Sequence, residues 1–344
     1  MRVLVTGGAG YIGSHTVLTL LEQGIDVIVL DNLVNSSDES LSRVSKICGR
    51  KPVFYQGDIL DRACVKRIFS NHEIDSVIHF AGLKSVGESV SKPIEYYQNN
   101  VIGSIVLLEE MHAANVIKLI FSSSATVYGE PEFVPLTENA KVGGTTNPYG
   151  SSKVMVEQIL QDFSLAHPDF SIVSLRYFNP VGAHPSGLIG EDPNGKPNNL
   201  LPYITQVAIG KLAKLAVYGN DYNTPDGSGV RDYIHVMDLA EGHLSTLNHL
   251  SPGYRTYNLG TGVGYSVLHI IKEFENITSV KIPFEIAPRR PGDIAECWAS
   301  PELARLELGW YAKRTLVDML QDSWKWQKMN PNGYASVTYQ KLHR

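Results

Sequence analysis

The sequence predicts an α/β fold built on a doubly wound parallel sheet. Short, largely apolar runs rich in β-branched residues alternate with amphipathic helical stretches, as in sheets whose strands are joined by helical crossovers. Continuous apolar runs are typical of strands that helices cover on both faces. A glycine-rich turn follows the first run directly. The runs expected to form strands lie at residues 3–6, 27–31, 53–56, 76–80, 119–122 and 172–177.

Length and composition suggest two domains. The chain has 344 residues, of which 43% are hydrophobic, enough for a large core and too many for one compact domain. We expect a nucleotide-binding domain at residues 1–178 and a smaller C-terminal α/β domain for a substrate at residues 179–344. Beyond residue 178 the alternation gives way to turn signals such as Asn179-Pro180 and Pro225-Asp226-Gly227. Residues 231–262 could return to the first domain.

Charge and cysteine usage narrow the class of partner. The net charge is -5 and no run of basic residues is present, so we expect no nucleic-acid partner. The sequence shows neither a charged leader before an apolar stretch nor a run of membrane-spanning length, so we expect a cytoplasmic protein without a membrane partner. Three widely separated cysteines, Cys48, Cys64 and Cys297, lack metal-ligand spacing. We therefore expect no metal site and a reducing compartment.

The glycine-rich turn after the first strand predicts a dinucleotide-binding, Rossmann-type domain. Gly7 permits the tight turn, Gly10 lets backbone amides approach a pyrophosphate, and Gly13 allows close helix packing. Asp31 ends the second strand, where a carboxylate accepts hydrogen bonds from both ribose hydroxyls and favours NAD over NADP. The alternative is an aspartate that caps the following turn. Asp58, after the third strand, could accept from the adenine amine.

Tyr149, Lys153 and Ser124 form the candidate catalytic group. A phenol is a poor base at its ordinary pKa of about 10, so a tyrosine that removes a proton near neutrality needs positive charge beside it. Lys153 can supply that charge because residues four apart share one face of a helix. Ser124, at a strand end, can hold the same substrate hydroxyl. Each motif alone also fits a solvated helix or an ordinary turn, but their placement at strand ends and a helix start favours a hydride-transfer site.

Several motifs taken together resemble the UDP-galactose 4-epimerases, which belong to the extended short-chain dehydrogenase/reductase family. The resemblance covers nearly the whole chain, and its motifs are specific in combination. Besides the glycine turn, they are Asp31-Asn32-Leu33, Gly57-Asp58-Ile59, residues 79–84, Asn99-Asn100, residues 122–129, Tyr149 to Lys153, Arg176 to Pro180, Pro197 to Leu200, Gly229 to His235 and Ala287 to Arg290.

The resemblance implies a reversible oxidation at C4 of a UDP-hexose. Tyr149, as phenolate, would remove the proton of the 4-hydroxyl while hydride passes to NAD. The resulting 4-keto sugar would turn over and take the hydride back on its other face, inverting C4. Lys153 and the cationic nicotinamide would bring the Tyr149 pKa from about 10 to near 7, about 4 kcal/mol of differential stabilisation. The resemblance also implies tightly bound NAD and a homodimer formed through helices at residues 93–114 and 150–166.

The same resemblance assigns binding residues by position. Lys84 can meet pyrophosphate charge, and the two arginines suit a diphosphate. The residues expected at the cofactor are Gly7, Gly10, Tyr11, Ile12, Gly13, Asp31, Asn32, Asn35, Ser36, Asp58, Ile59, Phe80, Ala81, Gly82, Lys84, Asn99, Ser122, Tyr149, Lys153, Tyr177 and Phe178. Those expected at the UDP-sugar are Ser124, Tyr149, Asn179, Asn199, Leu200, Tyr218, Arg231, Arg290, Asp293 and Cys297.

Cys297 departs from the pattern of epimerases restricted to UDP-glucose and UDP-galactose, which carry a tyrosine just before the tryptophan found here as Trp298. A thiol in place of a phenol ring leaves room for a 2-acetamido group. The resemblance therefore implies that UDP-N-acetylglucosamine and UDP-N-acetylgalactosamine are also accepted. The alternative is that Cys297 is a small core residue and its neighbours fill the gap.

Three rival functions share parts of this pattern. A nucleotide-sugar 4,6-dehydratase needs an acid and a base for elimination, and those relatives carry an Asp-Glu pair where this chain has Ala125-Thr126. A non-catalytic NAD-sensing or scaffold protein would not need the catalytic group. An ordinary NAD-dependent oxidoreductase would exchange its cofactor, so added NAD would turn over in bulk.

Overall fold

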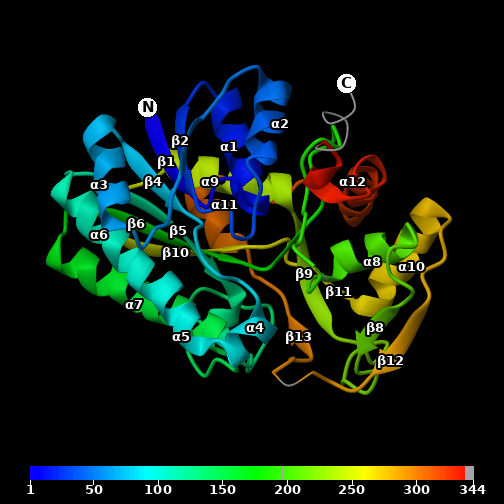
Figure 1. Cartoon of the computed structure of the whole chain (residues 1–344). Helices are drawn as coiled ribbons and strands as arrows, with labels where there is room; N and C mark the ends of the chain where they lie inside the picture. Colours follow the sequence, from blue (N-terminus) through cyan, green and yellow to red (C-terminus); the bar gives the residue numbers. More distant parts are fainter. Residues whose placement is uncertain (196, 291, 338–344) are drawn as a thin grey trace, which may run out of the picture.

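A seven-stranded parallel sheet forms the centre of the larger of two parts of the molecule, and one of its strands comes from the C-terminal third of the chain. The computed structural model describes residues 1–195, 197–290 and 292–337. The strand order is β10-β6-β5-β4-β1-β2-β3 with every pair parallel, which confirms the predicted doubly wound sheet (Figure 1). The strands are β1 (Arg2–Thr6), β2 (Asp26–Asp31), β3 (Val53–Gln56), β4 (Ser76–His79), β5 (Lys118–Ser124), β6 (Ser171–Tyr177) and β10 (Gly253–Leu259).

Helices cover both faces of this sheet, as its apolar strands require. Val3 and Val5 of β1 pack in one hydrophobic cluster with helices α1, α2 and α9. Leu4 packs in a second cluster with α3, α6 and α7, because successive side chains of a strand point to opposite faces. These helices are α1 (Tyr11–Glu22), α2 (Glu39–Cys48), α3 (Arg62–Asn71), α6 (Gly103–Ala113), α7 (Pro148–Ala166) and α9 (Val236–Asn248).

Two strands end at a residue other than the expected one. The strand expected at residues 76–80 ends at His79, where the chain leaves the sheet to pass beside the glycine turn. The strand expected at residues 119–122 continues to Ser124, because the backbone of Ser123 and Ser124 still pairs with β6 although the side chains are polar. The polar end of β5 therefore places Ser124 beside Tyr177.

The segment 231–262 is shared between two sheets. Its first strand, β9 (Val230–His235), pairs with short strands of the second part of the chain, whereas β10 lies beside β6 in the large sheet. The domain boundary at residue 178 remains a prediction. Asn179-Pro180, expected to mark a turn, instead lies in the short strand β7 (Asn179–Val181). Pro180 is tolerated because β7 pairs only with β9 and lies at a sheet edge.

The second part of the chain is a smaller α/β layer to the right of the large sheet in Figure 1. Its core joins Val217, Ile270 and Leu320, which lie on three different elements. The remaining strands are β8 (Leu215–Tyr218), β11 (Gly264–Ser266), β12 (Phe284–Ala287) and β13 (Glu296–Cys297). The helices are α8 (Leu200–Ala208), α10 (Val267–Thr278) and α12 (Leu316–Met329), with a short 3₁₀ turn η3 (Gly333–Val337). The helix α11 (Glu302–Leu308) instead packs against β10 of the large sheet.

The helical stretch expected at residues 93–114 is present, but it contains a π-helical turn. It comprises α5 (Pro93–Tyr96), a π-helical turn η1 (Tyr97–Ile102) and α6, and it follows α4 (Val86–Ser91). π-helical turns are often found at functional sites. Here the turn contains the buried Asn100.

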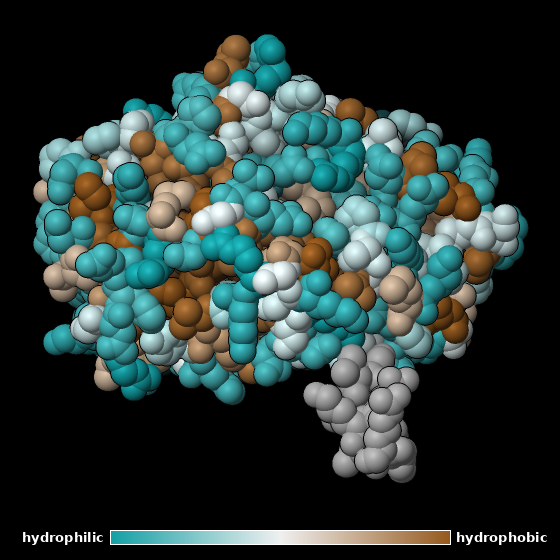
Figure 2. Space-filling model, turned by 90° about the horizontal axis from the view of Figure 1, so that it is seen from above, coloured by the Kyte–Doolittle hydropathy of each residue, from teal (hydrophilic) through white to brown (hydrophobic). Residues whose placement is uncertain are grey.

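The surface is mixed in character. The face seen in Figure 2 is mostly hydrophilic, with hydrophobic residues in small groups between polar ones. Within the part of the chain that the structure describes, no helix has both the length and the apolar composition needed to cross a bilayer.

Candidate functional site

The glycine turn between β1 and α1 is closely packed and has room only for hydrogen at two positions. Gly7 has φ +69°, and a Cβ atom there would lie 2.7 Å from the backbone nitrogen of Ala81. A Cβ atom on Gly13 would lie 2.2 Å from the Gly7 carbonyl oxygen. Gly10 precedes α1, whose first backbone N–H groups lack intrahelical partners. This turn fits the pyrophosphate of a dinucleotide, which helix N-termini bind through such groups.

The end of β2 carries the expected ribose residues, but Asp31 already caps a turn. Its carboxylate accepts hydrogen bonds from the backbone nitrogens of Ala9 at 3.0 Å and Leu33 at 2.9 Å, and from the Ser36 hydroxyl at 2.7 Å. The position of Asp31 is thus compatible with both predictions, a ribose ligand and a turn cap. The Asn32 amide donates to the Asp58 carboxylate at 2.9 Å, which joins the ends of β2 and β3. Among the other expected residues here, Asn35 is exposed and Ile59 is buried.

Ser124, Tyr149 and Lys153 converge at the carboxyl ends of β5 and β6. Ser124 hydrogen-bonds the Tyr149 hydroxyl, and the Lys153 ammonium lies 5.9 Å from the centre of the Tyr149 ring. Lys153 is buried and donates to the Ser122 carbonyl at 2.7 Å. Asn147 caps the start of α7 through the Gly150 nitrogen, so Tyr149 and Lys153 occupy the first turns of a well-anchored helix.

Desolvation shifts the pKa values of Tyr149 and Lys153 in opposite directions. Tyr149 is half-buried, and desolvation raises the pKa of its phenol, while the hydrogen bond from Ser124 lowers it. Burial lowers the pKa of Lys153 to about 8, and the negative charge of Glu157 raises it. A deprotonated Tyr149 near neutrality therefore needs positive charge beyond the hydrogen bond, consistent with a site that works with a cationic group next to the phenol.

The catalytic group and the glycine turn are joined by the loop after β4. The loop residue Ala81 touches Gly7, and a Cβ atom on the next residue, Gly82, would lie 3.8 Å from the Lys153 ammonium. Lys153 thus lies one short loop away from the dinucleotide turn. In parallel sheets, this edge is where ligands bind.

Asn100 fixes that loop, and the sequence reasoning gave it no role. Its side-chain oxygen accepts from the Leu83 nitrogen at 2.8 Å, and its amide donates to the Leu83 carbonyl and to the Ser152 hydroxyl, both at 3.0 Å. The expected cofactor residue Asn99 donates to the same oxygen. An asparagine beside the apolar residues Val101 and Ile102 in a helical stretch is a sequence signal that could have identified Asn100, since a polar side chain on a packed face needs partners.

A buried ion pair supports the catalytic helix from behind. The Glu157 carboxylate binds Arg176 of β6 in bidentate fashion, at 3.0 and 2.7 Å, and accepts from Ser123 at 2.5 Å. Arg176 also donates to the Tyr128 hydroxyl at 3.0 Å. The sequence reasoning missed Glu157, although it continues the four-residue spacing from Tyr149 through Lys153.

Tyr177 and Phe178 end β6 beside the expected cofactor site. The Tyr177 hydroxyl is hydrogen-bonded to the buried His243 ring of α9 and to the Ser122 side chain. Burial raises the pKa of the Tyr177 phenol. The Phe80 ring lies 4.8 Å from the same His243 ring. His243 therefore holds two of the expected cofactor residues in place, a contact that joins residues far apart in the sequence.

Apart from Ser124 and Tyr149, the expected substrate residues fall into three groups. Arg290 pairs with Asp293 at 2.9 Å and lies over the Tyr218 ring at 4.6 Å. Cys297 is a register partner of Arg231, and it is buried in an apolar cluster with Val127, Tyr128, Leu136 and Phe178. Burial raises the pKa of its thiol to about 11.

The third group lies where the two parts of the chain meet. Asn199 and Leu200 begin α8, Asn179 is exposed at the start of β7, and the Asn199 amide donates to the Glu191 carboxylate at 2.7 Å. The same carboxylate pairs with Lys84, an expected cofactor residue. Glu191 was missed, and no local sequence pattern identifies it.

The contact at Gly13 generates a prediction for cofactor retention. Gly13→Ala should lower the amount of NAD that the purified protein carries and destabilise the fold by about 1–3 kcal/mol, because the added methyl overlaps the Gly7 carbonyl. NAD content and the melting temperature measure these effects.

The matched control is Gly87→Ala in α4, where a Cβ atom meets nothing within 4 Å. Alanine there should be neutral or stabilising. Full NAD content with unchanged melting in Gly13→Ala would contradict the close packing of this turn.

Comparison with known proteins agrees with this geometry. The NAD dependent epimerase/dehydratase family matches residues 3–260. A UDP-glucose 4-epimerase of Yersinia enterocolitica is 85% identical over 334 residues, which are 97% of this chain and 99% of that protein. The crystal structure of UDP-glucose 4-epimerase from Bifidobacterium longum in complex with NAD+ and UDP is 57% identical, with a TM-score of 0.95 and coverage of 97% of this chain and 100% of that chain.

A more distant structure shows the same fold. The UDP-Glc/GlcNAc 4-epimerase of Campylobacter jejuni is 35% identical with a TM-score of 0.83, and the match covers 95% of this chain and 99% of that chain. The family match spans most of the sequence, and the relatives match over nearly their full length. The chain therefore belongs to the NAD-dependent epimerase/dehydratase family.

Proposed function

We propose that this protein is a UDP-glucose 4-epimerase that interconverts UDP-glucose and UDP-galactose. The observation that carries the proposal is the convergence of Ser124, Tyr149 and Lys153 one loop away from the glycine turn. The 85% identity to the Yersinia enterocolitica protein of that name supports it. The match of a structure in complex with NAD+ and UDP supports both ligands.

The residues present fit NAD at the glycine turn. Gly7, Gly10 and Gly13 would receive the pyrophosphate, and Asp31 would face a ribose. When bound, NAD supplies the hydride acceptor and donor for C4 of the sugar. The chain's own residues then carry out the proton transfer.

Tyr149 takes and returns the proton of the 4-hydroxyl. Ser124 hydrogen-bonds the phenol and so holds it at the strand end where a substrate hydroxyl would lie. Lys153, four residues along α7, adds positive charge from the buried side. Together they lower the free energy of the phenolate that burial alone would disfavour. The 4-keto sugar formed by oxidation can present either face while its UDP remains bound, so reduction inverts C4.

The dehydratase alternative lacks its acid and base. Ala125 and Thr126 begin a short 3₁₀ turn, η2 (Ala125–Tyr128), directly after Ser124. The Thr126 hydroxyl donates to Ser124 at 3.0 Å. A methyl group and a hydroxyl engaged with Ser124 cannot supply the carboxyl chemistry that elimination across C5 and C6 needs.

Removal of the Tyr149 hydroxyl tests the proposed proton carrier. The purified protein, without added NAD, should interconvert UDP-glucose and UDP-galactose, and Tyr149→Phe should lower kcat by about 10²–10⁴-fold because the general base is lost. Chromatographic resolution of the two sugars measures the rate. Tyr311→Phe, at an exposed position, is the control. An undiminished rate in Tyr149→Phe, or no C4 inversion by the native protein, would overturn the proposal.

We further propose that the substrate range includes the N-acetylated UDP-hexoses. Cys297 lies in the apolar cluster that also contains Val127 and Phe178, and Val127 follows Ser124 by three residues. A thiol here is far smaller than a tyrosine ring. The Campylobacter jejuni protein, which has the same fold, is named a UDP-Glc/GlcNAc 4-epimerase. Its name supports the view that this fold can accept both plain and N-acetylated sugars.

Exchange of this side chain tests the substrate range. Cys297→Tyr should selectively remove turnover of UDP-N-acetylglucosamine and UDP-N-acetylgalactosamine, because the added ring fills the space of the acetamido group. Cys297→Ser, of similar volume, should retain all four substrates. Ratios of kcat/KM for acetylated and plain sugars give the answer. Equal losses with both kinds of substrate in Cys297→Tyr would count against a gating role.

A homodimer is also proposed, formed through α5, η1, α6 and α7. These helices pack together on one side of the sheet, and they expose four large hydrophobic side chains: Ile94, Ile102, Met155 and Leu165. Burial of such side chains in an interface is favourable. Sedimentation velocity should give twice the mass of the chain, and Ile94→Glu combined with Leu165→Glu should shift the protein to monomer. A native protein that sediments as a monomer at micromolar concentration would contradict this proposal.

A further inference from the structure

Glu191 lies where the two parts of the chain meet, and it contacts one expected residue from each binding site. We propose that Glu191 is a positioning residue that orients Lys84 for the cofactor and Asn199 for the UDP-sugar, and thereby favours retention of both ligands. The inference rests on the proposed function, because that function assigns the two diphosphates to these sites.

One carboxylate oxygen serves both partners. Glu191 Oε1 accepts from the Asn199 amide at 2.7 Å and pairs with the Lys84 ammonium at 3.4 Å. The Glu191 side chain is only 8% exposed, whereas that of Lys84 is 58% exposed. A long exposed lysine side chain samples many rotamers, and a fixed buried carboxylate restricts them. Restriction before binding lowers the entropic cost of binding.

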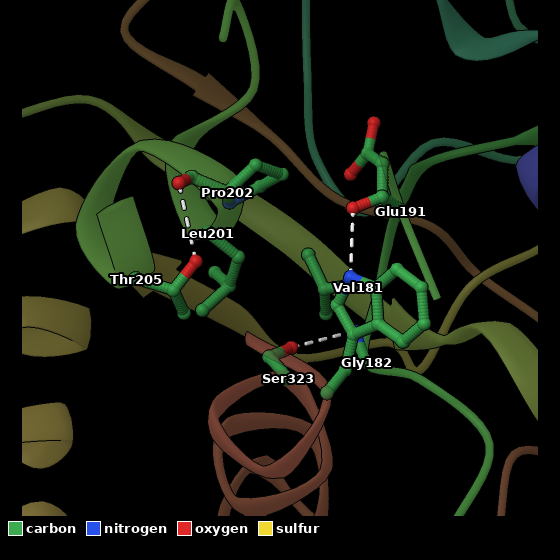
Figure 3. A pocket seen from close by; sticks show the side chains of 8 residues that line it. Val181, Gly182, Glu191, Leu201, Pro202, Thr205 and Ser323 are labelled. Carbon is green, nitrogen blue, oxygen red and sulfur yellow. Dashed lines mark hydrogen bonds between the residues drawn. The ribbon is translucent and has the colours of Figure 1, made fainter. Parts of the chain in front are cut away.

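The backbone around Glu191 is anchored on both sides of the junction. Its carbonyl accepts from the indole of Trp326 on α12 at 3.0 Å, and the Asp192 carboxylate accepts from the Tyr334 nitrogen at 2.8 Å. In Figure 3 the Glu191 carbonyl faces the pocket between β7, α8 and α12, and its carboxylate points away from it. On the other side, the Asn194 amide donates to the Val34 carbonyl at 3.1 Å, next to the expected ribose residues. The backbone that carries the Glu191 carboxylate is thus held by contacts that do not involve Lys84 or Asn199.

Charge disfavours direct contact between Glu191 and a diphosphate. Both neighbouring sites are expected to receive diphosphates, and a carboxylate repels such anions. Glu191 therefore acts through its two partners: its charge attracts Lys84, and its oxygen accepts from Asn199. These two contributions can be separated by substitution, because glutamine keeps the oxygen acceptor and loses the charge, whereas alanine loses both.

The test uses two binding readouts that do not require turnover. NAD retention is measured as the cofactor remaining after prolonged dialysis, and UDP affinity is measured by calorimetry on protein reloaded with NAD. Glu191→Gln should release NAD about tenfold faster with UDP affinity close to that of the native protein. Glu191→Ala should show the same faster release together with about tenfold weaker UDP binding, equivalent to about 1.4 kcal/mol.

The control is Glu285→Gln, which removes the charge from an exposed glutamate of β12 that pairs with Lys214, the residue directly before β8. It should change neither readout. The proposal is overturned if Glu191→Ala retains NAD and UDP like the native protein, or if the glutamine and alanine variants weaken UDP binding equally. Failure of the proposed function is a separate result, because it would appear as absence of C4 inversion in the native protein whatever the behaviour of the Glu191 variants.

Discussion

The structure of the site depends on one buried cation, the ammonium group of Lys153. An isolated ammonium is costly to remove from water, so its burial needs compensating partners. The Ser122 carbonyl accepts from it, and Glu157 lies one turn further along α7 with a negative charge. These partners come from β5 and α7, so the charge can persist only where strand and helix pack in this relative position. The same packing places Tyr149 against Ser124.

Glu157 also constrains the position of α7 relative to a second strand, β6. Its bidentate pair with Arg176 connects α7 to β6, and both side chains are buried. Burial of an ion pair seldom adds much stability, but loss of one partner leaves an uncompensated charge. The pair therefore restricts how α7 can dock on the sheet. The consequence for function is precise placement of the phenol and the ammonium at the edge where β5 and β6 end.

Close backbone contact brings the cofactor turn to this edge. Gly7 touches the Ala81 backbone, and Asn100 holds Leu83, two residues further on, through both its nitrogen and its carbonyl. The π-helical turn that carries Asn100 directs its side chain to the loop and to Ser152 of α7. A single buried amide thus joins the loop after β4 to the catalytic helix, and small shifts of one would be transmitted to the other.

The sequence alone was sufficient for features that depend on local spacing. Apolar runs predicted six strands of the sheet because both of its faces are covered, the glycines predicted the turn, and the four-residue spacing placed Tyr149 and Lys153 on one helix face. The polar end of β5 was missed because backbone pairing, not side-chain character, continues that strand. Asp31 was left with two interpretations, since a strand-end carboxylate can cap a turn and also face a ribose.

Only the tertiary structure decided contacts between distant residues. Glu191 meets Lys84 across 107 positions, and Tyr177 meets His243 across 66. No periodicity in a strand or helix relates such residues, because their proximity arises from the way separate elements pack. The seventh strand, β10, joined the sheet for the same reason: its place beside β6 follows from the crossover through α9, which packs against α1.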